Sequence, residues 1–104
     1  MLVENIYESL KTLEPDLSVS RFCTEYLDTC RSYLHNRKYE NRDVSSDVLI
    51  ALYGNLKQSA KTYSLLLKDT DRPESWSAHF ERRAELFDSL ADSVLEDITS
   101  RSLH

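Results

Sequence analysis

Glycine and proline are scarce in this chain of 104 residues, which has one glycine and two prolines. Tight β-hairpin turns favour such residues, so their scarcity argues against an all-β fold. A single glycine also excludes a glycine-rich phosphate loop. No apolar run approaches the roughly 20 residues that a membrane-spanning helix needs, and the N-terminus does not have the pattern of a signal peptide. We therefore expect an all-helical, cytoplasmic protein that has no membrane partner.

Cysteine and histidine, which serve as metal ligands and catalytic residues, are also few, at two and three residues. The two cysteines, Cys23 and Cys30, lie seven positions apart, and with His35 they do not match the ligand spacing of a zinc site. In the cytoplasm both thiols would stay reduced, and the simpler interpretation is that they are small buried apolar side chains. The other histidines, His79 and His104, are far away in sequence, and no local motif joins a histidine to a nucleophile. The sequence therefore predicts no metal, no cofactor and no enzymatic activity.

What the chain does have is apolar residues at helical spacing along most of its length. Its composition, 40% hydrophobic and 30% charged, is typical of one globular domain spanning residues 1–104. The pattern predicts an all-α fold of four to five helices. The first covers residues 4–13, the second begins at Ser18 or Ser20 and runs for about ten residues, and the third begins near Cys30. The fourth runs from Ser45 or Ser46 to residue 67, and the last runs from Pro73 to about residue 100. Asp28-Thr29 is expected to form a turn. The apolar residues keep their helical spacing through Gly54-Asn55, so we expect one continuous helix there.

Positive charge is concentrated in one short window, residues 30–42. This window carries a net charge of +3, whereas the whole chain carries −5, so the rest of the chain sums to −8. The segregation predicts one basic surface on an otherwise acidic protein. The alternative is a set of solvated cations near a helix C-terminus, where they interact favourably with the helix dipole. The charged residues of the window are Arg31, Arg37, Lys38 and Arg42, with Glu40 as the one acid.

The region around this window, residues 4–56, resembles the helix-turn-helix of Cro/repressor-type proteins. Phe22-Cys23 and Leu27-Asp28 lie where that family has its second helix and its turn. Arg31-Ser32-Tyr33-Leu34 lies where the recognition helix often has a polar-polar-aromatic-aliphatic run. On this resemblance, residues 1–68 form a helix-turn-helix-like part, and residues 73–100 form a long amphipathic C-terminal helix that can mediate dimerisation.

Three positions depart from the helix-turn-helix pattern. Thr24 replaces a small alanine, Asp28 replaces the turn glycine, and Arg37 replaces a buried aliphatic residue. A second resemblance, to a small uncharacterised family of short bacterial proteins, rests on another set of residues and implies no activity. That set is Phe22, Tyr26, Leu27, Ser32 and Tyr33.

The helix-turn-helix resemblance implies a dimeric DNA-binding protein that regulates transcription. The helix from Cys30 would enter the major groove of double-stranded DNA. Arg31, Ser32 and Asn36 would contact base edges. Phosphates would be contacted by His35, Arg37, Lys38 and Arg42. The net charge of −5 and the isoelectric point near 5.1 argue against strong binding to DNA, because affinity for DNA comes chiefly from phosphate neutralisation.

The long C-terminal helix supports an alternative function. A helix this long and this aromatic either crosses the whole domain or pairs with a second copy of itself. Its predicted dimer or partner face consists of Trp76, Phe80, Phe87, Leu90 and Val94, and its outer face is acidic. On this hypothesis the protein is an acidic interaction module that binds another protein and no DNA, such as an inhibitor or DNA mimic from a phage or mobile element. The simpler interpretation of most of the stripe is plain core.

Overall fold

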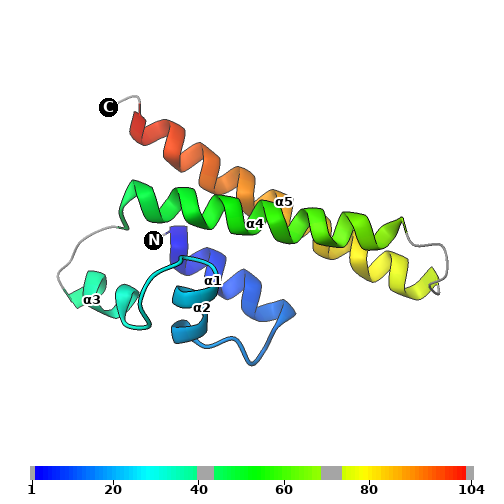
Figure 1. The fold of residues 1–104 in the computed structure, drawn as a ribbon, viewed down its shortest axis with the longest axis horizontal. Coiled ribbons are helices and arrows are strands. Elements are labelled where there is room, and N and C mark those ends of the chain that lie inside the picture. The colour runs from blue at the N-terminus through cyan, green and yellow to red at the C-terminus, as the bar shows by residue number, and fades with distance from the viewer. Residues whose placement is uncertain (1, 40–43, 69–73, 103–104) are drawn as a thin grey trace.

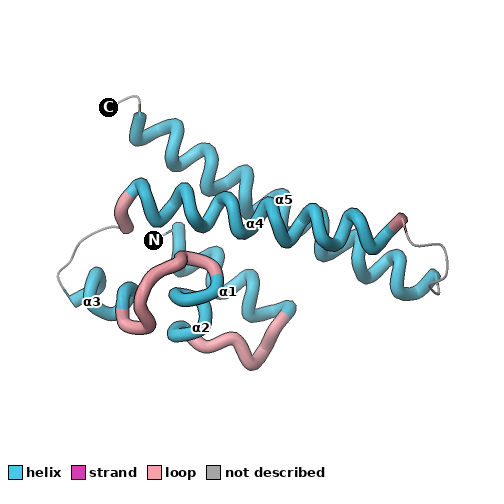
Figure 2. Tube along the Cα trace, viewed as in Figure 1, coloured by secondary structure: helices cyan, strands magenta, loops and turns pink. Residues whose placement is uncertain are grey.

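The structure, a computed structural model, describes residues 2–39, 44–68 and 74–102, and every regular element in these ranges is an α-helix. The helices are α1 (Leu2–Leu13), α2 (Val19–Glu25), α3 (Tyr33–Tyr39), α4 (Ser46–Leu67) and α5 (Glu74–Ser102). The all-α class and the long C-terminal helix are therefore confirmed. Figure 1 shows that α4 and α5 form a long antiparallel hairpin, and that α1, α2 and α3 lie along one side of α4. The loops between the short helices are prominent in this N-terminal part (Figure 2).

The start of α2 is fixed by a side-chain cap. Proline lies shortly after α1, at position 15, where it disfavours continuation of that helix. Ser18 then caps α2, because its hydroxyl accepts a hydrogen bond from the backbone N–H of Arg21 at 3.1 Å. Of the two predicted caps, Ser18 and Ser20, the structure thus selects Ser18. The connecting loop is held against α1 by the Tyr7 hydroxyl, which donates to the carbonyl of Leu17 at 2.9 Å.

A connection of seven residues, 26–32, separates α2 from α3. Asp28 adopts a left-handed conformation with φ of 54°, which confirms the predicted turn at Asp28-Thr29. The backbone N–H and the hydroxyl of Thr29 both donate to the carbonyl of Cys23, at 3.0 and 3.1 Å. These bonds commit Thr29 to the end of α2, and residues 30–32, which the prediction gave to the next helix, lie outside it. The predicted start near Cys30 is wrong, and α3 begins at Tyr33.

The central helix, α4, runs without interruption through Gly54, as predicted. Ser45 caps it by accepting from the backbone N–H of Val48 at 3.4 Å. The N–H of Ser45 itself donates to the hydroxyl of Tyr33 at 3.3 Å, which ties α3 to the start of α4. The Asn55 amide donates to the carbonyl of Tyr26 at 2.7 Å, which ties α4 to the end of α2.

The hydrophobic core is built around α4. Phe22 and Leu27 from the α2 region and the α4 residues Leu49, Leu52 and Leu56 are each at most 1% exposed. The α5 residues in the same cluster are Phe87, Ala91 and Val94. Two polar contacts set the register of the hairpin: Lys57 pairs with Asp88 at 3.1 Å, and Arg101 donates to the carbonyl of Val44 at 2.6 Å. The C-terminal helix therefore packs on its own domain.

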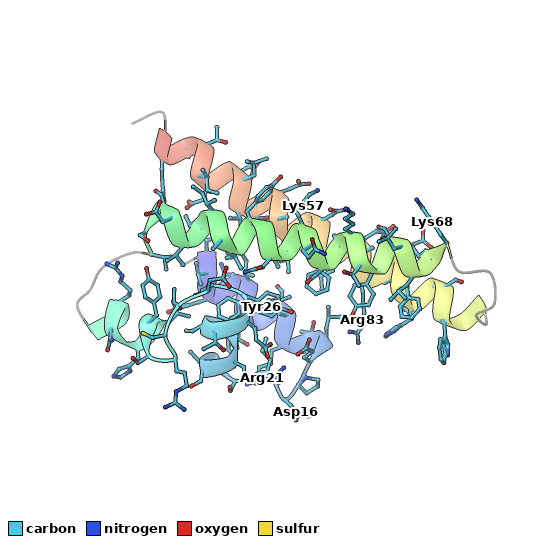
Figure 3. The ribbon with its side chains drawn as sticks, viewed as in Figure 1. Asp16, Arg21, Tyr26, Lys57, Lys68 and Arg83 are labelled. Atoms are coloured by element: carbon cyan, nitrogen blue, oxygen red, sulfur yellow. The ribbon has the colours of Figure 1, made fainter. Side chains whose placement is uncertain are left out.

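Arg83 joins the hairpin to the end of α1. Its guanidinium donates to the hydroxyl of Tyr63 on α4 at 3.2 Å and to the carbonyl of Leu13 on α1 at 3.5 Å. Figure 3 shows Arg83 at this junction. The contact gives α5 a direct link to α1 in addition to its packing on α4. None of the helices in the described ranges is long and apolar enough to cross a membrane.

Replacing Gly54 with alanine is expected to raise the free energy of unfolding by about 1 kcal/mol, because glycine is a poor helix former. A Cβ at this position would meet no atom within 4 Å, so alanine would gain helix propensity at no steric cost. Urea unfolding followed by circular dichroism measures the change. Lys61→Ala, an exchange of two good helix formers at an exposed position of α4, is the control. A Gly54→Ala variant less stable than the wild type would contradict the open surroundings of Gly54.

Candidate functional site

A groove with a volume of about 1000 Å³ lies between α1, the start of α2 and the start of α3. Apolar parts of Tyr7, Val19 and Leu34 contribute to its surface. Glu4 and Glu8 line it from α1, whereas Arg31 and His35 line it from the other side, next to or within α3. We call this feature the α1–α3 groove. It combines an apolar surface with an acidic wall and a basic wall.

The apolar surface of the groove is held in place by the core beneath it. The ring of Tyr7 contacts the buried ring of Phe22, with the centroids 5.4 Å apart, and its hydroxyl is bonded to Leu17. Leu34 is half-buried and packs against the core cluster. Val19, at the first position of α2, is 43% exposed. The groove therefore presents an apolar surface supported by the core, and Val19 is the most exposed aliphatic side chain of its lining.

The acidic wall follows from the amphipathic pattern of α1. Val3, Ile6 and Leu10 are the buried residues of this helix. Glu4 and Glu8 are one turn apart and exposed, so they form a single edge of the helix beside the groove. Among the described residues, no ion pair joins either glutamate to Arg31 or His35 across the groove. These four side chains are thus free to meet charges on a bound molecule.

The basic side of the groove contains only part of the predicted DNA-contacting set. Arg31, Ser32 and His35 line the groove and are exposed. Asn36 is exposed outside the groove lining, and its amide donates to the Ser32 hydroxyl at 3.5 Å. Since α3 begins at Tyr33, Arg31 and Ser32 precede the helix rather than lie within its first turn.

The remaining predicted phosphate contacts do not extend this basic side. Arg37 is half-buried, and its guanidinium lies 5.1 Å from the centre of the Tyr33 ring. Burial opposes ionisation of Tyr33, but hydrogen bonds with Ser45 and Arg37 outweigh it, so the pKa of Tyr33 is lowered from its ordinary value. Arg37 is thus engaged with its own helix. The side chain of Lys38 and the whole of Arg42 lie outside the described residues.

The predicted partner face of the C-terminal helix is divided between core and surface. Phe87 and Val94 are 4% and 0% exposed, and the Phe87 ring stacks on Tyr63 of α4 with the centroids 5.7 Å apart. Leu90 and Phe80 are half-buried. Trp76 is 50% exposed. Helix α4 packs against this stripe and buries most of its apolar surface, for which the sequence did not identify a covering element.

Sequence reasoning missed Glu4, Glu8, Tyr7 and Val19 as parts of a site. The first three belong to an ordinary amphipathic helix, and no local motif shows that their edge of α1 will face α3. Within the described ranges, no group of three or more histidine, cysteine or acidic side chains is placed to hold a metal ion. Cys23 is buried and Cys30 is exposed at the groove, and both are free thiols.

Comparison with known proteins gives the chain a family but no activity. No curated protein and no solved structure matches it. A family model described as a family of unknown function, DUF6626, matches residues 3–100. This match includes all of the groove and nearly all of the hairpin, so both are parts of one family unit. The chain therefore belongs to the DUF6626 family.

Proposed function

We propose that the protein is a non-enzymatic, cytoplasmic interaction module whose α1–α3 groove binds a short amphipathic helix of another protein. The observation that carries this proposal is the combination of an apolar surface with walls of opposite charge in one groove of about 1000 Å³. Helix-in-groove recognition depends on apolar anchor residues that enter such a surface. Two free thiols are compatible with a reducing compartment.

The charges of the groove define the chemistry of the bound segment. An aliphatic or aromatic side chain would pack on Tyr7, Val19 and Leu34, as anchor residues do at protein interfaces. A lysine or arginine on one edge of the segment would face Glu4 and Glu8. An aspartate or glutamate on the other edge would face Arg31 and His35. Charges arranged in this way fix the orientation of the segment and exclude partners of the opposite pattern.

The same charges weaken the case for nucleic acid at this site. A phosphate placed against Arg31 would share the groove with Glu4 and Glu8, and Arg37 is engaged with Tyr33. The seven-residue connection before α3 is longer than the usual turn of a helix-turn-helix, which has three or four residues. These features, together with the net charge of −5, support our proposal of a protein partner in preference to DNA.

DNA binding in transcription regulation is the second candidate function, and one observation favours it. Arg31, Ser32 and Asn36 are all exposed around the start of α3, which is where a recognition helix contacts base edges. If DNA is bound, a duplex complex should weaken steeply with salt. Arg31→Glu should abolish that complex, whereas Val19→Asp should change it much less, because Val19 carries no phosphate contact in this arrangement.

Selection from a library of displayed helical peptides tests the proposed function. Enriched peptides are expected to carry an apolar anchor with basic residues on one edge and acidic residues on the other. Their affinity should fall at least about tenfold for Val19→Asp, which places a carboxylate on the apolar surface of the groove. Binding is measured by fluorescence polarisation with the isolated peptides.

Leu65→Asp is the matched control for this selection. Leu65 is 55% exposed on α4, so the change also replaces an exposed aliphatic residue with an acid, but at a residue that does not line the groove. It should leave the affinity for the peptides unchanged. Peptides that bind Val19→Asp as well as they bind the wild type would overturn the assignment of the groove.

A further inference from the structure

The outward side of α4 carries a second surface that neither the core nor the α1–α3 groove uses. Ile50 and Leu65 on this side are each 55% exposed, which makes them the most exposed large hydrophobic residues in the described ranges. Gly54 lies between them and is also exposed. We call this surface the α4 face, and it consists of the exposed residues Asp47, Ile50, Gly54, Lys61, Leu65 and Lys68. Their spacing of three, four or seven residues keeps them on one side of the helix.

The α4 face is complementary to itself when one copy is reversed. The midpoint of Asp47 and Lys68 falls between residues 57 and 58, and the pairs Ile50 and Leu65, and Gly54 and Lys61, share that midpoint. In two antiparallel copies related by a two-fold axis through this point, each Ile50 faces Leu65 of the second copy. Each Asp47 likewise faces Lys68 of the second copy. A two-fold interface requires this kind of self-complementarity.

We propose that the protein forms a two-fold dimer by antiparallel pairing of α4 with α4 of a second copy. The two Ile50–Leu65 contacts would bury the exposed apolar side chains, and the Asp47–Lys68 pairs would close both ends of the interface. The antiparallel arrangement also brings opposite ends of the helix dipoles together. A Cβ added at Gly54 would meet no atom within 4 Å beyond its own helix backbone, so this position leaves room for the Lys61 stem of the second copy.

This dimer surface differs from the one that the sequence suggested and leaves the groove free. The sequence placed dimerisation on the C-terminal helix, where Phe87 and Val94 are buried in the core. Figure 3 shows Lys68 of the α4 face on the side of α4 opposite to Tyr26, which belongs to the N-terminal part. Both copies would therefore keep an open α1–α3 groove, and the dimer would present two grooves to its partners. One helix pair makes a small interface, so we expect a weak dimer.

Sedimentation velocity of the full chain over a wide range of concentrations tests the dimer. Ile50→Glu and Leu65→Lys should each raise the dissociation constant at least about tenfold, because each sets a charge against an apolar side chain. Both positions are exposed, so the fold should remain intact, as circular dichroism would verify. The double variant should recover most of the wild-type affinity, because the introduced carboxylate faces the introduced ammonium group of the second copy.

Val19→Asp is the control, since Val19 is exposed at the groove and not on the α4 face. It should not change the dissociation constant of the dimer. A wild-type protein that stays monomeric at all concentrations would overturn the proposal, as would a double variant no better than its single changes. Peptide binding and dimerisation have separate readouts, so a failure of one proposal is distinguishable from a failure of the other.

Discussion

Phe22→Ala is expected to lower the free energy of unfolding by about 3–5 kcal/mol, the usual cost of removing a buried aromatic ring. Phe22 is fully buried, and its ring centroid lies 5.4 Å from that of Tyr7 and 5.8 Å from that of Tyr26. The ring thus connects α1 with α2 and supports the apolar surface of the groove. Domains of this size are stable by only about 5–15 kcal/mol, so the variant would lose a large share of its stability.

Urea unfolding monitored by circular dichroism and by tyrosine fluorescence measures this loss. Leu95→Ala is the control, because Leu95 is 43% exposed on α5 and its removal leaves no closed cavity. That change should cost less than about 1 kcal/mol. A loss of stability in Phe22→Ala no larger than that in Leu95→Ala would contradict the position of the Phe22 ring at the centre of the N-terminal part.

Raising the pH from about 10 to 12 is expected to destabilise the protein through Tyr26. Burial, with smaller contributions from Glu14 and Glu25, raises the pKa of Tyr26 from 10.0 to about 12. The folded state therefore keeps the phenol protonated over a range in which the unfolded chain releases the proton. The stabilisation is complete below about pH 10 and is lost between about pH 10 and 12, up to a total of about 2–3 kcal/mol.

Tyr26→Phe isolates this contribution. The variant keeps the ring contact with Phe22 and the backbone carbonyl that accepts from Asn55, but it has no group to ionise. Its free energy of unfolding, measured in urea at several alkaline pH values, should fall less steeply than that of the wild type. Equal slopes in the two proteins would show that Tyr26 does not cause the alkaline loss.

The helices were predictable where a local signal fixes them. Pro15 and the Ser18 cap define the loop between α1 and α2, and the apolar phase through Gly54 predicts one continuous α4. The start of α3 was not predictable in this way. Its position depends on the bonds from Thr29 to the carbonyl of Cys23, which close α2 and leave seven residues, 26–32, between the two helices. Such a closure depends on the conformation of the turn, which the residue types alone do not specify.

The candidate site was predictable only in part, because the net charge of a sequence window differs from the net charge of the surface that the window joins after folding. The window around Arg31 is basic, but folding places Glu4 and Glu8 of α1 in the same groove. The cation of Arg37 lies over the Tyr33 ring of its own helix. The first outcome results from tertiary packing between segments about 25 residues apart, and the second from a local contact between residues one turn apart in α3. A net charge summed over a window describes neither.

The long C-terminal stripe illustrates the same limit for apolar residues. Its aromatic spacing predicts a packed face but does not identify the surface that covers it. The structure supplies α4 as that surface, through the Tyr63–Phe87 stack and the Lys57–Asp88 ion pair. As a result, the large apolar residues that stay exposed in the described part of the hairpin are Ile50 and Leu65 on α4 and Trp76 and Leu95 on α5, in place of the continuous face that the sequence suggested.

Chemical-shift mapping by nuclear magnetic resonance tests the role of the α1–α3 groove most directly. A peptide from the selection is titrated into the isotopically labelled protein, and amide shifts are compared between the wild type and Val19→Asp. The largest shifts are expected at residues such as Tyr7, Val19 and Leu34, and they should vanish in the variant. Shifts that cluster on α5, or that persist unchanged in Val19→Asp, would contradict the groove as the functional site.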